Sequence, residues 1–224
     1  MSRDPVFEVT SAAANAAARR LTTAAKVQAV LFGGVATDTA LIEAMIDRVS
    51  ARAARHCNLA KDATGTPPTF GRETCRATWP VRGGACDELL FLPWRVPITS
   101  ISSVVEDGVT LSATDYRLRG GAILERLSDD VPVPWSRAKI VVTYVAGWQL
   151  AEADQVPPDL EAAVIDQVKA MYQSRTRDQT LLSEQVPDVY SVTYGVAGGH
   201  GISGDGLLSQ VEAVLADYRA PTAL

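Results

Sequence analysis

Histidine, cysteine and aromatic residues are scarce in this chain of 224 residues, which has two histidines, three cysteines and 6% aromatic residues. The cysteines, Cys57, Cys75 and Cys86, are an odd number at unrelated spacings. Such a set is not a disulfide framework and predicts reduced thiols.

A run of about 18 consecutive apolar residues is also lacking, so we expect no membrane-spanning helix. The N-terminal residues contain no apolar segment of the kind that a secretion signal needs, so we expect a protein that is made and used inside a cell, or in a particle assembled there.

The residues that could bind a metal are scattered along the chain. His56 and Cys57 are the one adjacent pair of soft ligands, whereas Cys75, Cys86 and His200 stand alone. A structural zinc site needs four ligands, usually in two close pairs. We therefore expect no metal site, and a helix-end histidine beside a half-buried thiol is the simpler interpretation.

The glycine-rich run 195–206 is the one candidate for a phosphate-binding or catalytic loop. A P-loop needs a Lys followed by Ser or Thr at its end, and this run has neither. The segment around Ser203 does not fit the nucleophile elbow, because its second glycine comes one residue early. No set of nucleophile, base and orienting residue can be proposed. We therefore predict a flexible loop, no catalytic or cofactor-binding residues, no cofactor and no enzymatic activity.

The overall composition is that of an ordinary globular protein, with 47% hydrophobic and 21% charged residues. The chain is long enough for one large domain or two small ones. Its net charge of −5 argues against a generally basic surface that binds nucleic acid. These numbers favour a globular protein that does not recognise nucleic acid by bulk charge.

Helical patterns fill the N-terminal third. Residues 11–31 are alanine-rich and can form helix, and Thr37 or Asp38 can cap a second helix. We expect helices at about 24–31 and 38–57. The apolar stripe of the second helix consists of Leu41, Ile42, Met45, Ile46, Val49 and Ala53.

Strand patterns replace the helical ones after the Pro67-Pro68 loop. The β-branched segment 98–105 is followed by Asp107-Gly108, which favours a tight hairpin turn, and 139–145 is the strongest single strand. We expect a small antiparallel sheet of four to six strands at about 74–148, whose edges could pair with another chain across 98–126. Four tryptophans fall in this region, as core anchors or as a stacking platform for a sugar or base: Trp79, Trp94, Trp135 and Trp148.

Two further helices are expected in the C-terminal third. Pro157-Pro158 favours a helix start, which predicts a helix at about 158–177. A last helix is expected at about 206–219, with Asp205 as its N-cap. The apolar residues of this last segment form a stripe that needs a surface to cover, and they are candidates for an interface with another chain: Leu207, Leu208, Val211, Val214, Leu215 and Tyr218.

The order of these segments resembles one protein family across roughly Leu21 to Arg219. The pieces are LPWRVPITSISSVVEDGVTL at 92–111, ATDYRL at 113–118, GGAILERL at 120–127, IVVTYVAGW at 140–148 and VPPDLEAAVIDQVKAMYQSR at 156–175. This succession is similar to that of the head–tail connector (portal adaptor) proteins of long-tailed bacteriophages and gene transfer agents. The resemblance implies an α+β fold, a helical bundle with an antiparallel β-rich subdomain inserted between its helices.

The resemblance also implies a structural role. Members of the family form a ring, usually of twelve subunits, beneath the portal protein, and present a surface to the stopper or tail-completion protein. We therefore expect a protein of the virion neck, at the head–tail junction, that is assembled in the bacterial cytoplasm without contacting a membrane. Packaged DNA is expected to pass through the ring without specific recognition. The expected domains are an N-terminal extension at 1–20 and the connector domain at 21–224. This extension and the loop at 195–206 depart from the family pattern.

Two other functions fit the same residues. One is a small carbohydrate-binding module or enzyme that uses the tryptophan-bearing sheet. The other is a different virion component, such as a tail-completion protein. Gel filtration with light scattering, on the protein alone and with a portal protein, separates these functions from the connector.

Overall fold

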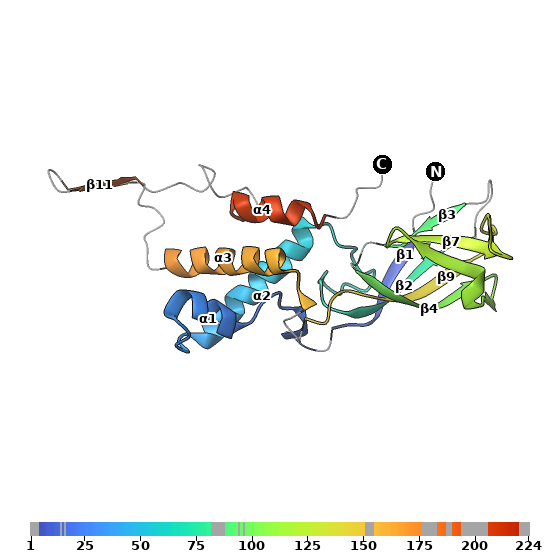
Figure 1. Cartoon of the computed structure of the whole chain (residues 1–224), viewed down its shortest axis with the longest axis horizontal. Helices are drawn as coiled ribbons and strands as arrows, with labels where there is room; N and C mark the ends of the chain where they lie inside the picture. Colours follow the sequence, from blue (N-terminus) through green and yellow to red (C-terminus); the bar gives the residue numbers. More distant parts are fainter. Residues whose placement is uncertain are drawn as a thin grey trace. The chain divides into compact units, whose positions relative to one another are not determined.

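The computed structural model describes residues 5–13, 15, 17–81, 88–93, 95, 97–150, 155–175, 183–186, 190–193 and 206–219, with 183–186 and 190–193 described by their backbone. These residues form a mixed α and β fold with antiparallel sheets and four α-helices (Figure 1). The chain divides into two compact units. The β unit contains residues 1–19 and 58–152, and the helical unit contains residues 20–57 and 153–224.

The helical unit is built around α3, which packs against the other three helices (Figure 1). The helices are α1 (Ala24–Phe32), α2 (Thr39–His56), α3 (Pro158–Ser174) and α4 (Ser209–Ala216). Their apolar stripes meet in one core, whose fully buried members include Val27, Ile42, Ile46, Val49, Leu160, Val164, Val168 and Leu215. Ion pairs tie the helices together at the rim, as between Lys26 and Glu161, whose Nζ and Oε2 atoms lie 2.8 Å apart.

The helix ends differ from the sequence expectation in two places. Asp38 precedes α2 with a left-handed backbone (φ 51°), but its carboxylate does not cap the helix. It accepts hydrogen bonds from Tyr172 Oη (2.6 Å) and Arg175 Nη1 (2.9 Å) instead. The N-cap of α4 is Leu208, so the prediction of Asp205, which lies outside the described residues, was wrong.

The alanine-rich segment 11–31 is less helical than its composition predicts. The helix expected at 24–31 is present as α1, but among the described residues before it only a 3-10 turn at Ala17–Arg19 is helical. The preceding residues form a strand, β1 (Val6–Ser11), which was missed in the region expected to be an extension. Without large apolar residues, alanine gives a helix little to pack against, and helix propensity alone is a weak determinant.

The β unit contains a five-stranded antiparallel sheet in the order β1-β2-β9-β4-β5. Its strands are β1, β2 (Glu73–Trp79), β9 (Ile140–Ala146), β4 (Ile98–Glu106) and β5 (Val109–Thr110). The predicted Asp107-Gly108 hairpin is confirmed, because Glu106 pairs with Val109 and both turn residues have positive φ. Strand β9 is central, and its residues alternate between buried and half-buried along its length.

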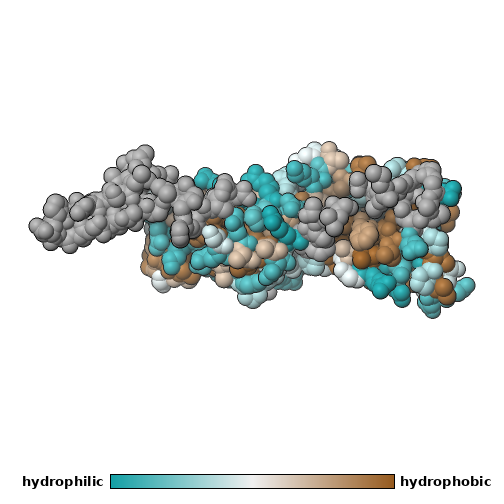
Figure 2. Space-filling view, turned by 90° about the horizontal axis from the view of Figure 1, so that it is seen from above, coloured by the Kyte–Doolittle hydropathy of each residue, from teal (hydrophilic) through white to brown (hydrophobic). Residues whose placement is uncertain are grey.

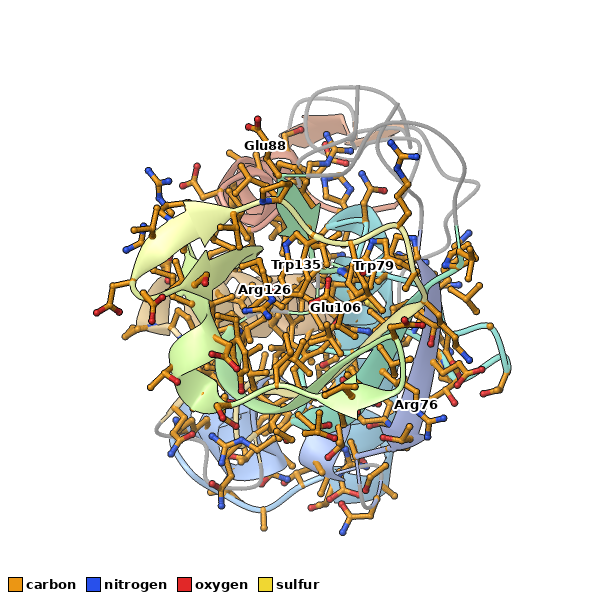
Figure 3. All side chains as sticks on the ribbon, turned by 90° about the vertical axis from the view of Figure 1, so that its right-hand side faces the viewer. Arg76, Trp79, Glu88, Glu106, Arg126 and Trp135 are labelled. Carbon is orange, nitrogen blue, oxygen red and sulfur yellow. The ribbon has the colours of Figure 1, made fainter. Side chains whose placement is uncertain are left out.

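A second antiparallel sheet in the β unit contains β3 (Leu89–Phe91), β7 (Ile123–Ser128), β6 (Tyr116–Arg119) and β8 (Val131–Val133). A polar bridge joins it to the first sheet: Arg126 Nε donates to Glu106 Oε2 (3.0 Å), and the Ser136 amide donates to Glu106 Oε1 (2.7 Å) (Figure 3). Burial raises the pKa of Glu106, but these hydrogen bonds outweigh it and lower the pKa overall. The apolar core of the unit includes Trp79, Trp135, Ile140, Val142 and Tyr144.

A separate hairpin lies between α3 and α4 in the sequence. Its strands, β10 (Ser183–Val186) and β11 (Tyr190–Thr193), pair antiparallel in a sheet of two strands. In the described part of the chain, neither strand pairs with a third. Nor does any helix there have the length and apolarity that crossing a membrane requires.

Candidate interaction surfaces

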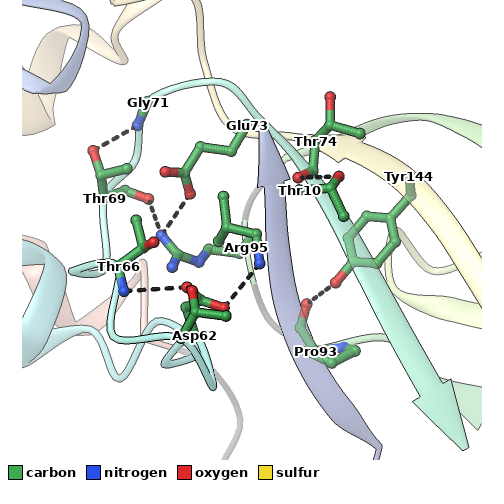
Figure 4. Close-up of polar contacts among 12 residues, drawn as sticks. Thr10, Asp62, Thr66, Thr69, Gly71, Glu73, Thr74, Pro93, Arg95 and Tyr144 are labelled. Atoms are coloured by element: carbon green, nitrogen blue, oxygen red, sulfur yellow. Dashed lines mark hydrogen bonds and ion pairs between the residues drawn. The ribbon is translucent and has the colours of Figure 1, made fainter. Parts of the chain in front are cut away.

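One edge of the five-stranded sheet is closed by a loop. Strand β1 pairs with β2 on its inner side, and on its outer side the Val9 amide donates to Asp62 Oδ1 (2.9 Å). The Ala63 amide donates to the Phe7 carbonyl (2.9 Å). The loop therefore satisfies backbone groups of β1 that would otherwise be open to another strand (Figure 4).

Asp62 is held rigidly in this position. Besides Val9, its carboxylate accepts hydrogen bonds from the Thr64 hydroxyl and the Thr66 amide. Burial raises the pKa of Asp62, but these hydrogen bonds prevail and hold the pKa well below its usual range. The carboxylate is therefore ionised at neutral pH and acts as a fixed acceptor at the sheet edge.

A buried ion pair lies beneath β1. Arg95 Nη1 lies 2.9 Å from Glu73 Oε2, and the two side chains are 2% and 1% exposed (Figure 4). Arg95 Nη1 also donates to the Thr69 carbonyl (3.2 Å), and its guanidinium lies 5.4 Å from the ring centroid of Phe7. Burial raises the pKa of Glu73, and the charge of Arg95 opposes that shift in part. Phe7 belongs to β1. This strand therefore covers the buried ion pair in addition to pairing with β2.

The opposite edge of the sheet is largely open. Strand β5 pairs with β4 at Val105 and Glu106, and the Leu111 amide donates to the Val104 carbonyl (2.9 Å). In the described part of the chain, no strand pairs with the outer side of residues 98–103. This stretch, ITSISS, contains no charged residue and no proline, although two bulges interrupt its register with β9.

Hydrophobic residues are exposed on both units, and Figure 2 shows brown patches interrupting the hydrophilic surface. On the helical unit they are Val30, Val35 and Leu41; on the β unit they are Val6, Val81, Phe91, Val109 and Val131. Val109 and Val131 each follow a hairpin turn. Single exposed apolar residues are common on monomeric proteins, so these positions alone identify no partner.

The six candidate interface residues at the C-terminus divide into two sets. Leu207, Val211 and Leu215 are at most 1% exposed, because α4 packs on α3 within the helical unit. The other three, Leu208, Val214 and Tyr218, are half-buried. A partner that meets the unit as it stands therefore reaches only the second set.

Polar contacts fix α4 on the unit. The Leu208 amide donates to Gln167 Oε1 (2.8 Å), and Tyr218 Oη donates to Asp159 Oδ1 (2.7 Å). Arg52, one of three arginines on a flank of α2, donates from Nη1 to the Gly206 carbonyl (3.0 Å). These contacts show why α4 folds back onto its own chain.

Three of the residues considered for metal chemistry are described: His56 and Cys57 belong to the helical unit, and Cys75 belongs to the core of the β unit. Cys57 Sγ lies 3.4 Å from the Leu215 carbonyl, and His56 Nδ1 lies 4.0 Å from Glu212 Oε1. Burial raises the pKa of the Cys57 and Cys75 thiols to about 12, which makes them unreactive at neutral pH. Cys86 and His200 lie outside the described residues. Among the residues described, no three His, Cys, Asp or Glu gather in a group that could hold a metal.

The three tryptophans that the structure describes form no exposed stacking platform. Trp79 is 1% exposed and Trp135 is 0% exposed, with Trp135 Nε1 donating to the Leu124 carbonyl (3.3 Å). Trp148 is half-buried and its ring packs on Phe70 at a centroid distance of 5.5 Å. Trp94 lies outside the described residues. The core-anchor interpretation is confirmed for Trp79 and Trp135.

Comparison with known proteins gives structural likeness alone. No protein-family model matches the chain, and no curated protein matches it. One similar structure is a chain in the neck of an empty GTA particle computed with C6 symmetry. The two chains are 16% identical, with a TM-score of 0.55, and the match covers 97% of each of them. A chain in the virion of a native gene transfer agent (GTA) particle has a TM-score of 0.54, 15% identity and the same coverage. The chain therefore shares, along nearly its whole length, the fold of chains found in gene transfer agent particles.

Proposed function

We propose that this protein is a structural component of the neck of a phage or phage-like particle. The observation that carries the proposal is the likeness in fold to a chain in the neck of a gene transfer agent particle, which spans 97% of both chains. The order of sequence segments from Leu21 to Arg219, which resembles the connector family, supports the same role independently of the fold.

Within the neck, the role is that of a head–tail connector. The protein forms a ring, a dodecamer, beneath the portal protein and joins the capsid to the stopper or tail-completion protein. Packaged DNA passes through the ring without specific recognition. The helical unit is the bundle and the β unit is the subdomain inserted between its second and third helices. The role is structural, with no catalytic step.

The interface with the portal or a neighbouring subunit includes the C-terminal helix. Val214 on α4 and the flanking residues Leu208 and Tyr218 are half-buried, and they are the members of the sequence-derived set that a partner reaches directly. Leu207, Val211 and Leu215 support that surface from beneath. A carbohydrate-binding module or enzyme using the tryptophan-bearing sheet is disfavoured, because Trp79 and Trp135 are buried.

Deleting the gene from the host that produces the particle tests this function. A connector is required after DNA packaging, so the deletion is expected to leave DNA-filled capsids and separate tails. Expression of the protein from a plasmid should restore tailed particles. Normal tailed particles in the deletion strain, or a failure of capsid formation itself, would contradict the role.

A further inference from the structure

The buried ion pair beneath β1 leaves part of its hydrogen-bonding capacity unused. The side chains of Arg95 and Glu73 are at most 2% exposed. Arg95 Nη1 donates to the Thr69 carbonyl (3.2 Å), but Arg95 Nε and Nη2 have no hydrogen-bond partner in the described part of the chain. A buried charged donor without a partner costs free energy, and most buried polar atoms in proteins are satisfied by protein groups or by ordered water. These two nitrogens therefore call for an acceptor.

The carboxylate of Glu73 lacks hydrogen bonds in the same place. Its Oε2 atom lies 2.9 Å from Arg95 Nη1 as an ion pair, yet neither oxygen accepts a hydrogen bond of good geometry from the residues that the structure describes. Burial raises the pKa of Glu73, whereas the charge of Arg95, the nearby Ala13 amide and the charge of Arg19 lower it. Arg19 Nε is itself buried without a partner among the described residues. Unsatisfied donors and acceptors therefore gather in one cluster.

The enclosure around this cluster is held shut by contacts within the β unit (Figure 4). Strand β1 contributes Phe7, whose ring centroid lies 5.4 Å from the Arg95 guanidinium, and β2 contributes Glu73. The loop after α2 fixes β1 from its outer side, where Asp62 Oδ1 accepts from the Val9 amide (2.9 Å). Because β1 is held on both sides, the unsatisfied atoms stay shielded from bulk solvent. Their partner therefore has to lie inside the enclosure.

We propose that at least one buried water molecule is bound beneath β1 and bridges the guanidinium of Arg95 to the carboxylate of Glu73. A water molecule can accept a hydrogen bond from Arg95 Nε or Nη2 and donate one to a carboxylate oxygen, so a single molecule satisfies groups of both kinds. Buried water typically makes about three such bonds to groups that otherwise lack partners. The site completes a polar junction of β1 with β2, and it does not depend on the proposed neck function.

The charges of the cluster favour water over an ion as the ligand. Two arginines, Arg19 and Arg95, are matched by two carboxylates, Asp62 and Glu73, all of which act on one another across this site. An added anion or cation would leave an uncompensated charge in a buried place, which is costly. The part of the chain that the structure describes also contains no group of three His, Cys, Asp or Glu that could hold a metal.

A crystal structure of the whole protein, at a resolution that shows ordered water, tests the site directly. The expected result is a water molecule within hydrogen-bonding distance of Arg95 Nε or Nη2 and of a Glu73 carboxylate oxygen. Direct hydrogen bonds from these nitrogens to protein groups, with no water between, would overturn the proposal. A metal ion or an anion bound in the same place would overturn water as the ligand.

Oxygen-17 relaxation dispersion, which counts long-lived internal water molecules, tests the same site in solution. The test variant Arg95→Met/Glu73→Leu replaces both partners by apolar side chains, a change that buried ion pairs often tolerate. It is expected to lose at least one internal water molecule relative to wild type. The matched control is Arg76→Met/Glu8→Leu, at an exposed ion pair of the same two strands (Nη1 to Oε2, 3.7 Å), which should lose none. Equal counts in the test variant and wild type would overturn the site. If the test variant does not fold, the crystal structure of the wild-type protein decides.

Discussion

Gly71 and Gly147 mark a place where two backbones cross within the β unit. The Trp148 amide donates to the Phe70 carbonyl (2.8 Å), and the Gly147 amide donates to the Pro97 carbonyl (2.8 Å). Gly147 has φ +94°, and a Cβ at this position would overlap the carbonyl of Gly71. The Ala-Gly-Trp sequence at the end of β9 is therefore explained by a close approach that only glycine permits.

Gly147→Ala is predicted to destabilise the protein by at least about 3 kcal/mol, since strain and a backbone clash combine. The matched control is Gly121→Ala, which has φ +77° but open space around its Cβ position. The control substitution is expected to lower the free energy of unfolding by about 1 kcal/mol. Urea unfolding measures both, and equal losses would show that the crossing at Gly147 imposes no constraint of its own.

The buried pair of Glu73 and Arg95 gives a second prediction at this scale. Arg95→Met removes the cation and leaves a buried carboxylate, which typically costs about 3–5 kcal/mol. The pKa of Glu73 is already raised in the folded state by burial, and loss of Arg95 raises it further. A raised pKa means that the fold favours the protonated acid, so this contribution to stability is present below the unfolded pKa and is lost as pH rises through the folded pKa.

The Arg95→Met variant should therefore lose more stability, relative to wild type, at pH 7 than at pH 4. Chemical unfolding at the two pH values measures this difference. The double variant Arg95→Met/Glu73→Gln is the control, because it has no carboxylate to titrate at this position. A loss in Arg95→Met that does not vary with pH would argue against a buried charge as its cause.

At the scale of the elements, sequence patterns predicted features set by neighbouring residues better than features that depend on contacts between residues far apart in the sequence. The Asp107-Gly108 turn could be predicted because neighbouring residues determine it. Strand β1 could not, since its partner strand begins more than 60 residues later, at Glu73, and a lone six-residue alternation is a weak signal. The role of Asp62 at the sheet edge was missed for the same reason: it depends on a contact with Val9, which is 53 residues away.

Asp62→Ala is predicted to loosen β1 without unfolding the β unit. The substitution removes the acceptor of the Val9 amide and opens the edge that the loop closes. Hydrogen exchange of the amides of residues 6–11 should become faster, whereas exchange in the central strand β9 should change little. Lys61→Ala, at an exposed neighbouring position, is the control. Unchanged exchange in β1 would show that pairing with β2 alone holds this strand.

Two substitutions in helix α4 are expected to separate the stability of the protein from its binding to a partner. Leu215→Ala removes a fully buried side chain and should cost about 2–5 kcal/mol of unfolding free energy. Val214→Ser changes a half-buried neighbour and should leave stability nearly unchanged while weakening attachment to portal-bearing capsids. Thermal unfolding and co-sedimentation with capsids measure the two effects. If Val214→Ser attaches normally, this face of α4 is not part of the interface.

At the scale of the whole molecule, the sequence predicted a mixed fold of helices and antiparallel strands, and that prediction is confirmed. The interaction surfaces were harder to predict. An apolar stripe such as Leu207, Val211 and Leu215 has the same pattern whether it covers its own core or a partner, and here it covers its own core. A sheet edge leaves no distinct sequence pattern either, because the pairing of a strand's outer side depends on residues far away in the sequence.

The location of the protein in the assembled particle tests the central claim most directly. Cryo-electron microscopy of particles with a tag fused to the protein would show where it lies. The connector role predicts a symmetric ring of this chain between the portal and the tail, with tag density at that level alone. Particles in which the chain is absent from the neck, or is found in the capsid shell or the distal tail, would contradict it.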